Sequence, residues 1–337
     1  MRAWQFSQLG LENLTLTERP TPTPGPREVL VKIHAVSLNY RDLLFAWGKY
    51  NPSPTFPAIP CSDGAGEVVA VGSEVTRWKP GDRVTPIFMQ GWIDGGARAE
   101  YRKTALGGGD IDGTLAEYGT FHEDGLVAMP DGYSYEEAAT LPCAAVTAWN
   151  AVVEVSRVKA GDTVLTLGSG GVSVFALQFA KMHGARVIAT SGSDEKRARL
   201  EELGADATIN YKTTPEWERE VLSLTGGEGV DNVVEVGGAG TIAKSAASAR
   251  VGGTVSVIGV LTQGEGLNPV QTLMRSLRVQ GIFVGSRAMF EAMNRAIGVN
   301  KLRPVIDRSF AFDEAPAAFE YLKSGAHFGK IVIRVSE

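Results

Sequence analysis

The feature that most constrains the fold is a glycine-rich turn, GSGGVS at residues 168–173, between an apolar run and a helical pattern. The run TVLTL at 163–167 is typical of a buried strand, and VFALQFAKM at 174–182 has helical periodicity. Glycine permits a tight turn and leaves space beside the backbone. A strand, a glycine turn and a helix in this order predict one βα unit of a parallel sheet.

A longer alternation of the same kind surrounds this turn. Apolar runs typical of buried strands, at residues 186–189, 231–236 and 254–260, are separated by helical patterns. This alternation predicts a doubly wound α/β fold, a parallel sheet with helices on both faces. The first part of the chain differs, because residues 28–39 alternate apolar and polar side chains as a half-buried strand does. At 337 residues the chain exceeds the usual size of a single core, so we expect two units.

The glycine turn has the composition of an anion site. Backbone N–H groups and the positive end of the following helix face any ligand placed there, and glycines let phosphates approach the backbone. We therefore predict that the turn binds the pyrophosphate of a dinucleotide through Gly168, Gly170, Gly171 and Val172. Ser173 replaces the third glycine of the usual pattern. A turn that is tight only for packing is the alternative, and the flanking strand and helix favour the nucleotide site.

The end of the second strand bears on which nicotinamide cofactor binds. An NAD site normally has Asp or Glu there to bond the ribose 2′-hydroxyl. Here Ser191 stands at that position, which leaves room for a 2′-phosphate, and Lys196 and Arg197 follow at the start of the next helix. NADP(H) is therefore favoured over NAD(H). Asp194 and Glu195 intervene, and the two basic residues could instead form a solvated helix face.

The composition excludes several other classes of protein. A formal net charge of -5 gives no electrostatic reason to expect nucleic acid or an anionic membrane as a partner. No apolar stretch reaches the roughly 18 residues of a spanning helix, and the start MRAWQFSQLG lacks the features of a signal peptide. We expect a cytoplasmic protein with a small-molecule partner. Two cysteines, Cys61 and Cys143, cannot form a disulfide framework or a four-cysteine zinc site.

Six segments together resemble the medium-chain dehydrogenase/reductase superfamily, in its zinc-free quinone-oxidoreductase-like and alcohol-dehydrogenase-like branch. They are EVLVKIHAVSLNYRDLL, PCSDGAGEVVAVGSEVTRWKPGDRV, EEAATLPCAAVTAWNAV, GSGGVS, LGADATINY and HFGKIVI. The resemblance covers the chain from end to end. It implies a GroES-like catalytic domain over residues 1–124, a Rossmann domain over 125–286, and a return to the catalytic domain over 287–337.

The resemblance also shows where this chain departs from its zinc-dependent relatives. Their Cys, His and Cys ligand positions correspond to Asn39, Ser62 and Cys143 here. Zinc prefers thiolate, imidazole and carboxylate ligands, so an amide, an alcohol and one thiol do not form a convincing site, even with Asp63 beside Ser62. The four cysteines of the structural zinc lobe are also missing. We therefore expect no metal.

Further residues follow from the resemblance alone. Asn39 and Tyr50 match polar positions near the nicotinamide, where Tyr50 is the better candidate for a proton donor. Thr147 matches a position beside the nicotinamide, and Tyr211 and Lys330 match positions near the adenosine phosphate. The candidate apolar contacts along the cofactor are Val260, Phe283 and Val284.

Three functions remain open from the sequence. The first is an NADP(H)-dependent reductase of enones or quinones, and the second is an NAD(P)-dependent alcohol or aldehyde dehydrogenase. The third is a nucleotide-binding protein with a structural or regulatory role. A homodimer formed through residues 277–284 is a further expectation from the family.

Overall fold

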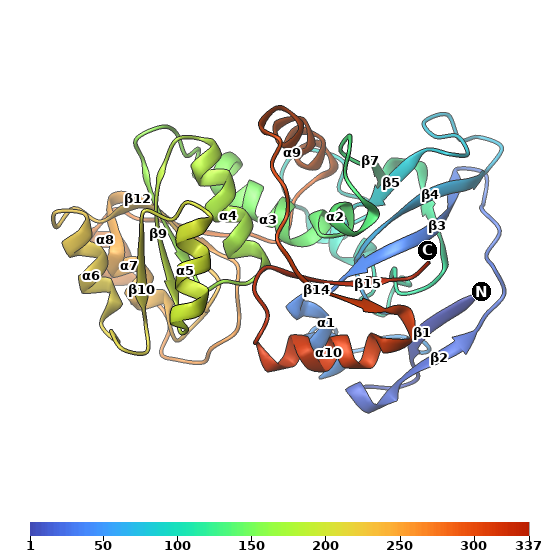
Figure 1. The fold of residues 1–337 in the computed structure, drawn as a ribbon, viewed down its shortest axis with the longest axis horizontal. Helices are drawn as coiled ribbons and strands as arrows, with labels where there is room; N and C mark the ends of the chain where they lie inside the picture. The colour runs from blue at the N-terminus through green and yellow to red at the C-terminus, as the bar shows by residue number, and fades with distance from the viewer. Residues whose placement is uncertain (337) are drawn as a thin grey trace. The chain divides into compact units, whose positions relative to one another are not determined.

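The computed structural model describes residues 1–336 and divides into two compact units (Figure 1). One unit contains Met1–Val146 together with the chain from Gly285 onward, and the other is Thr147–Val284. The first division therefore lies about twenty residues later than the expected boundary at 124/125. The reason is that β7 (Leu126–Ala128) pairs with β5 (Arg83–Pro86), and α2 (Tyr135–Ala139) packs on the sheet of the terminal unit.

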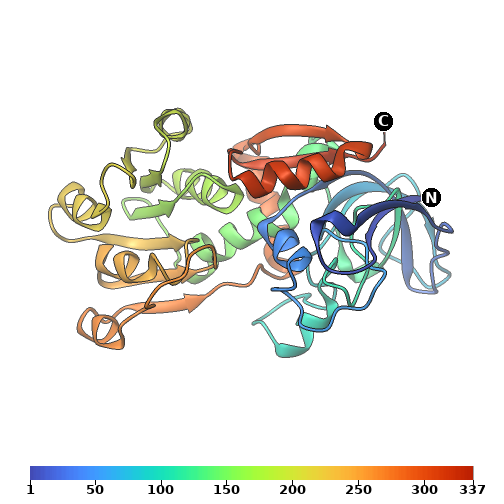
Figure 2. The ribbon, with the colours of Figure 1, turned by 90° about the horizontal axis from the view of Figure 1, so that it is seen from below.

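The central unit is built on a six-stranded sheet in which every pair of strands is parallel. The strand order is β10-β9-β8-β11-β12-β13, with β13 at one edge. Figure 2 shows β13, in orange, along the outer margin of this unit. The strands are β8 (Thr163–Leu167), β9 (Arg186–Ser191), β10 (Ala207–Asn210), β11 (Val230–Glu235), β12 (Ala249–Val257) and β13 (Arg278–Gly281).

Helices link these strands, and their sequence positions explain the predicted alternation. The helix α4 packs on β8 and β9, α5 on β9 and β10, and α7 on β11 and β12. The helices are α4 (Gly171–Met182), α5 (Asp194–Glu202), α6 (Trp217–Leu224), α7 (Ile242–Ser248) and α8 (Pro269–Met274), preceded by α3 (Val146–Trp149) and a π-helix, η5 (Asn150–Val155). Because parallel crossovers are right-handed, the reversal of strand order at β8 and β11 puts α4 and α5 on the face opposite α6 and α7. The doubly wound class is confirmed.

The terminal unit is β-rich, as expected for a GroES-like domain. Its main sheet has the order β14-β15-β3-β4-β5-β7, with β6 also pairing with β3, and β1 and β2 form a separate hairpin. The remaining strands are β1 (Arg2–Phe6), β2 (Leu14–Glu18), β3 (Glu28–Ser37), β4 (Asp63–Val71), β6 (Tyr118–His122), β14 (Ile306–Ala311) and β15 (Lys330–Arg334). The central strand β3 thus has a C-terminal strand, β15, on one side and β4 on the other.

Short helices complete this unit. The capping box predicted at Ser134 is present, since Glu137 N–H donates to Ser134 Oγ (3.1 Å) and Ser134 N–H to Glu137 Oε2 (2.9 Å). The α-helices besides α2 are α1 (Tyr40–Ala46), α9 (Arg287–Asn300) and α10 (Ala315–Ser324). The 3₁₀ segments are η1 (Leu11–Asn13), η2 (Ala99–Thr104), η3 (Glu123–Gly125) and η6 (Phe312–Glu314), and η4 (Leu141–Ala145) is a π-helix.

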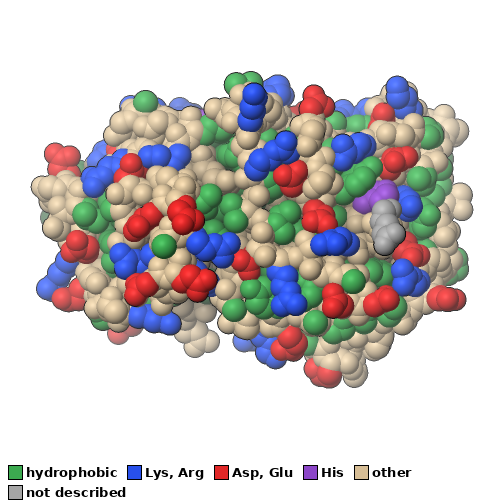
Figure 3. Space-filling view, in the orientation of Figure 1, with side chains coloured by type: hydrophobic (Ala, Val, Ile, Leu, Met, Phe, Trp, Pro, Cys, Tyr) green, Lys and Arg blue, Asp and Glu red, His purple; other side chains and the backbone are tan. Residues whose placement is uncertain are grey.

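Two surface properties bear on partners. No helix within residues 1–336 has the length and apolar character needed to cross a membrane. On the face displayed in Figure 3, Lys and Arg side chains are interspersed with Asp and Glu. That face therefore lacks the extended basic surface on which nucleic-acid binding depends.

Candidate active site

The glycine turn lies at the carboxyl end of β8, where α4 begins. Gly168 has φ +75°, which favours glycine, and Gly170 is the N-cap of α4 with no side-chain cap. A Cβ atom built on Gly168 or on Gly170 meets no heavy atom within 4 Å. The first N–H groups of a twelve-residue helix therefore adjoin open space, which is the arrangement that binds a phosphate.

Ser173 has a structural reason to replace the third glycine. Its side chain is buried, and Oγ–H donates to the Leu167 carbonyl oxygen at 2.6 Å. This bond ties the first turn of α4 to the last residue of β8. The hydroxyl therefore holds the helix close to the strand, so the imperfect motif still gives a close βα turn.

At the end of β9, small residues surround the position where a 2′-phosphate is expected. Ser191 is 2% exposed, and its Oγ accepts a hydrogen bond from Ser193 N–H at 3.3 Å. A Cβ atom on Gly192 would stand 2.6 Å from the Tyr211 hydroxyl, so Tyr211 lies directly against this glycine. Lys196 lies in the first turn of α5, where its backbone N–H donates to Ser193 Oγ.

Arg197 is held by other groups. Its Nε and Nη2 donate to Oγ1 and O of Thr208 (3.1 and 3.2 Å), and Nη1 pairs with Asp194 Oδ1 at 2.9 Å. Asp194 Oδ1 also accepts from Asn210 Nδ2 at 2.8 Å, and these bonds lower the pKa of its carboxyl. Arg197 and Asp194 thus join α5 to β10.

The other candidate cofactor contacts in the central unit differ in exposure. Thr147 and Val284 are buried, whereas Val260 and Phe283 are exposed. Val284 has φ +58°, an unusual conformation for a β-branched residue, and its carbonyl accepts from Asn150 Nδ2 at 2.7 Å. Asn150 was missed in the sequence, where its only signal is a polar residue within an apolar helical segment.

The candidate catalytic residue Asn39 belongs to a buried polar cluster in the terminal unit. Continuing the antiparallel register Val332↔Ser37 places Lys330 opposite Asn39. The Lys330 ammonium donates to Leu38 O and to Asn39 Oδ1, each at 2.7 Å, and Lys330 is only 3% exposed. The family resemblance predicted both Lys330 and Tyr211 near the adenosine phosphate. In the structure Tyr211 belongs to the central unit, and Lys330 bonds Asn39 in the terminal unit.

Asp63 completes this cluster from the strand on the other side of β3. Its Oδ1 accepts from Ser62 Oγ–H at 2.7 Å, and its Oδ2 accepts from Cys143 N–H at 3.1 Å. Burial raises the pKa of the Asp63 carboxyl, opposed first by the positive charge of Lys330 and then by the Asn39, Ser62 and Cys143 donors. Asn39 Nδ2 lies near this carboxylate but makes no hydrogen bond of acceptable geometry.

A second charged pair supports Tyr50. Arg41 donates from Nη1 to the carbonyl oxygens of Leu106 (2.9 Å) and Gly107 (3.0 Å), and its guanidinium stacks over the Tyr50 ring at 4.2 Å. Burial raises the pKa of Asp42 from 3.8 to about 6, against the opposing charge of Arg41. Asp42 Oδ2 also accepts from Asn39 N–H at 2.8 Å. This pair therefore fixes the backbone at Asn39 and the ring plane of Tyr50.

These donor groups do not fit a zinc ion. Asn39 Oδ1 is bonded to an ammonium, and Ser62 donates its hydroxyl proton to Asp63. Cys143 is therefore the one residue at the three aligned positions that zinc prefers as a ligand. Within residues 1–336 no three His, Cys, Asp or Glu side chains are grouped so as to hold a metal ion. Zinc prefers thiolate, imidazole or carboxylate ligands, of which this cluster offers one thiol and the Asp63 carboxylate, and a zinc ion here would lie near the positive charge of Lys330.

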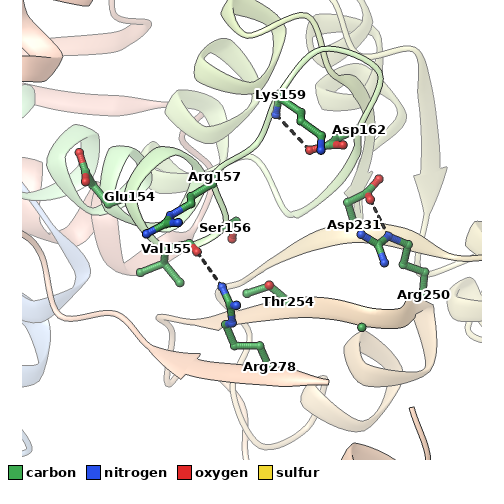
Figure 4. Close-up of a pocket in the computed structure, with 11 residues that line it drawn as sticks. Glu154, Val155, Ser156, Arg157, Lys159, Asp162, Asp231, Arg250, Thr254 and Arg278 are labelled. Atoms are coloured by element: carbon green, nitrogen blue, oxygen red, sulfur yellow. Dashed lines mark hydrogen bonds and ion pairs between the residues drawn. The ribbon is translucent and has the colours of Figure 1, made fainter. Parts of the chain in front are cut away.

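Two further features of the central unit lie outside the sequence predictions. Glu235, at the end of β11, is fully buried, and its Oε1 accepts from Gly237 N–H, Gly238 N–H and Thr241 Oγ–H at 2.6–2.9 Å. A cavity of about 430 Å³ lies at the end of the sheet opposite the glycine turn, beside the amino ends of β8, β11 and β13 (Figure 4). Its Arg250–Asp231 pair (2.6 Å) is far along the strands from the glycine turn, so the cavity is separate from the nucleotide site.

Comparison with known proteins agrees with the fold. Residues 25–131 match the alcohol dehydrogenase GroES-like domain, and residues 171–298 match the zinc-binding dehydrogenase family. A Rossmann unit with a dinucleotide turn and a GroES-like unit with a buried polar cluster define an NAD(P)-dependent oxidoreductase. The chain belongs to the medium-chain dehydrogenase/reductase superfamily.

Individual relatives carry two kinds of name. A "zinc-type alcohol dehydrogenase-like protein" of Schizosaccharomyces pombe is 43% identical over 97% of this chain and 96% of its own length. The human "quinone oxidoreductase" is 27% identical over 99% of this chain and 96% of its own. The crystal structure of a "putative alcohol dehydrogenase" from Sinorhizobium meliloti superposes with a TM-score of 0.93 at 41% identity, covering 99% and 98% of the two chains.

Proposed function

We propose that this oxidoreductase is zinc-independent and uses NADP(H) to reduce an enone or a quinone. The observation that carries the proposal is the chemistry at the three positions aligned with zinc ligands. They hold an amide bonded to Lys330, a hydroxyl bonded to Asp63 and a single thiol, Cys143. With no metal to bind an alcohol oxygen, polarisation must come from hydrogen-bond donors, which suit a carbonyl oxygen already activated by conjugation.

The preference for NADP(H) is supported by the end of β9. The buried Ser191 places a hydroxyl where a carboxylate would repel a 2′-phosphate, and Tyr211 lies against Gly192 with its hydroxyl nearby. Lys196 in the adjacent first turn of α5 supplies positive charge. The phosphates of the cofactor would lie on Gly168, Gly170, Gly171 and Val172.

We assign the chemistry of the terminal unit to Asn39 and Tyr50. The nicotinamide, when bound, supplies a hydride to the electrophilic carbon of the substrate. As the π electrons move to the carbonyl oxygen, the negative charge there is met by Asn39, Tyr50 or a bound water. The Tyr50 phenol, held in plane by Arg41, then gives the proton that completes the two-electron reduction and is reprotonated from water.

An NAD(P)-dependent alcohol or aldehyde dehydrogenase is the second candidate, because relatives at 30–33% identity carry the name alcohol dehydrogenase. The same residues would act in reverse on an alcohol, with a base taking the hydroxyl proton. We also propose that the reaction takes place in the cytoplasm.

The test is stopped-flow oxidation of NADPH and NADH by EDTA-treated protein, against an enone, a quinone and an aldehyde. We expect turnover of an enone or quinone with NADPH and no requirement for zinc. Ser191→Asp should reverse the cofactor preference, and the neutral isostere Ser191→Asn should keep it. Tight NADH binding by the unaltered protein would contradict the 2′-phosphate assignment, and activity restored only by zinc would contradict the metal-free mechanism.

We also propose a homodimer formed through the edge of the central unit. The edge strand β13 has an unpaired side, and the neighbouring α8 exposes Val270, Leu273 and Met274 by 59%, 75% and 74%. An unpaired edge beside an exposed apolar surface is a natural site for pairing between identical chains.

A further inference from the structure

The cavity at the amino ends of the central strands is a second place where the central unit can bind a ligand. Its volume is about 430 Å³, and most of the side chains that line it are charged or carry a hydroxyl group. The glycine turn lies at the carboxyl ends of the same parallel strands, and a five-residue strand such as β8 spans about 16 Å. A molecule in this cavity therefore does not occupy the nucleotide site.

The register of three neighbouring strands builds the floor of the cavity. Asn232 on β11 pairs with Thr254 on β12, and Thr254 pairs with Arg278 on β13. Residues in one row of a parallel sheet point to the same face. Ser156 lies on that face, directly after η5, because its Oγ accepts from Asn232 Nδ2 at 2.5 Å. The sheet thus brings a serine, a threonine and an arginine together.

Two arginines and two hydroxyl groups form one end of the cavity. Figure 4 shows Arg157, Ser156, Thr254 and Arg278 grouped there. Arg157 has no hydrogen bond or ion pair within residues 1–336, and Arg278 uses one N–H, from Nη1 to Val155 O at 3.3 Å. A guanidinium presents paired N–H donors that match the oxygens of a phosphate. This end is therefore suited to a phosphate group.

The Thr254 hydroxyl is a second, independent indication of a ligand. Thr254 lines the cavity and is only 6% exposed, and its Oγ1 has no hydrogen-bond partner in the described part of the chain, residues 1–336. A polar group withdrawn from water without a partner costs free energy, which an acceptor on a ligand would offset. The hydroxyl is therefore a donor that the fold itself does not use.

The nearby carboxylate does not neutralise the arginine end. Glu154 also lines the cavity, but its Oε1 accepts from Trp149 Nε1–H at 3.1 Å. Figure 4 shows the Glu154 carboxylate directed away from Arg157 and Arg278. The charges of both arginines therefore remain available to an anion.

The other end of the cavity carries charges of both signs. Lys159, Asp162, Asp231 and Arg250 lie there (Figure 4). Arg250 Nε pairs with Asp231 Oδ1 at 2.6 Å, and Asp162 Oδ2 accepts from Lys159 N–H at 3.0 Å. Among residues 1–336, neither Asp162 Oδ1 nor the Lys159 ammonium has a partner. Hydroxyl groups suit this end, because they donate to a carboxylate and accept from an ammonium.

We propose that this cavity binds a hydroxylated phosphate monoester of the sugar-phosphate class. The phosphate contacts Arg157, Arg278 and Thr254. The sugar hydroxyl groups contact Lys159 and Asp162. The volume falls within the range of about 300–1,000 Å³ that is typical of small-molecule sites. None of the described residues that line the cavity is aromatic, so a nucleotide base would have no ring on which to stack.

Isothermal titration calorimetry of the full chain with ribose 5-phosphate tests this proposal. The protein is first saturated with NADP⁺, or with NAD⁺ if that binds better, so that the glycine turn is already filled. We expect one binding event per chain, weaker binding of inorganic phosphate, and no binding of ribose. AMP should bind no more tightly than ribose 5-phosphate does.

Two variants and a control identify the residues. Arg157 has φ +52°, so Arg157→Asn keeps a residue type that tolerates this conformation. Combined with Arg278→Gln, it should weaken ribose 5-phosphate binding by about tenfold or more, because both charged donors are lost. Thr254→Val removes only the unpartnered hydroxyl, so it should weaken binding severalfold without lowering Tm. Arg295→Gln removes an exposed arginine of α9 and should leave the affinity unchanged.

Several results would overturn the proposal. The site is excluded if the unaltered protein binds no ribose 5-phosphate at millimolar concentration, or if the double arginine variant and Thr254→Val both keep full affinity. Binding seen only in the absence of dinucleotide belongs to the glycine turn and excludes it equally. Tighter binding of AMP would overturn the sugar-phosphate class, and equal binding of inorganic phosphate would overturn the role of Lys159 and Asp162. The binding requires no hydride transfer, so a failure of the proposed reduction leaves this site standing.

Discussion

Replacing Asp42 by Asn should stabilise the folded protein, by an amount that depends on pH. Asp42 is fully buried, and burial raises its pKa from 3.8 to about 6. At 1.36 kcal/mol for each unit of pKa, this difference corresponds to about 3 kcal/mol. Above pH 7 the Asp42 carboxyl of the folded protein is ionised, although burial favours its protonated form. Asn resembles the protonated acid in shape and can still accept from Asn39 N–H.

The sign follows from proton binding. Between pH 4 and 6 the folded state binds more protons at Asp42 than the unfolded state does, so this group lowers the free energy of unfolding as the pH rises. The advantage of Asp42→Asn over the unaltered protein should therefore be about 3 kcal/mol at pH 8 and about 1 kcal/mol at pH 4.5. The raised pKa of Asp63 acts in the same direction in both proteins and largely cancels in the comparison.

Urea unfolding followed by tryptophan fluorescence at pH 4.5, 6 and 8 measures this difference. Asp94→Asn, which removes an exposed carboxylate by the same isosteric change, is the control and should follow the unaltered protein at each pH. The reasoning is refuted if Asp42→Asn is destabilised by 2 kcal/mol or more at pH 8. The attraction between Arg41 and Asp42 would then exceed the cost of burying the carboxylate, since removing one partner of a buried ion pair typically costs about 3–5 kcal/mol. An advantage that does not change with pH would refute it equally.

Two other predictions concern the central unit. Glu235→Gln should lower the free energy of unfolding by about 2–4 kcal/mol, because the three donors on Oε1 would lose an anionic acceptor and an amide N–H₂ would replace Oε2 opposite the Ser245 hydroxyl. A loss below 0.5 kcal/mol in chemical denaturation would contradict this. Leu273→Asp combined with Met274→Asp should convert the proposed dimer to a monomer in sedimentation velocity, whereas Val299→Asp, at an 82% exposed residue of α9, should not. An unchanged dimer in the double variant would exclude α8 from the interface.

The sequence by itself determined the fold class and the position of the glycine turn between a strand and a helix. Both depend on local patterns: helical and strand periodicity sets the alternation, and glycines at 168, 170 and 171 mark a turn whose conformation is decided within a few residues. The residues at the three positions aligned with zinc ligands, Asn39, Ser62 and Cys143, could also be read from the sequence. The capping box at Ser134 was found correctly for the same reason.

Only the tertiary structure decided the partners of those residues. Lys330 and Asn39 are 291 residues apart in sequence and meet because β15 pairs with β3, a register that no local pattern reveals. Arg197 was a plausible phosphate ligand by charge, and the structure instead gives it Thr208 and Asp194. The helix at Ser134 has the pattern of the central series but packs on the other unit, which moved the boundary to residue 146. Local chemistry specifies which groups are available, and the long-range pairing of strands determines which of them act together.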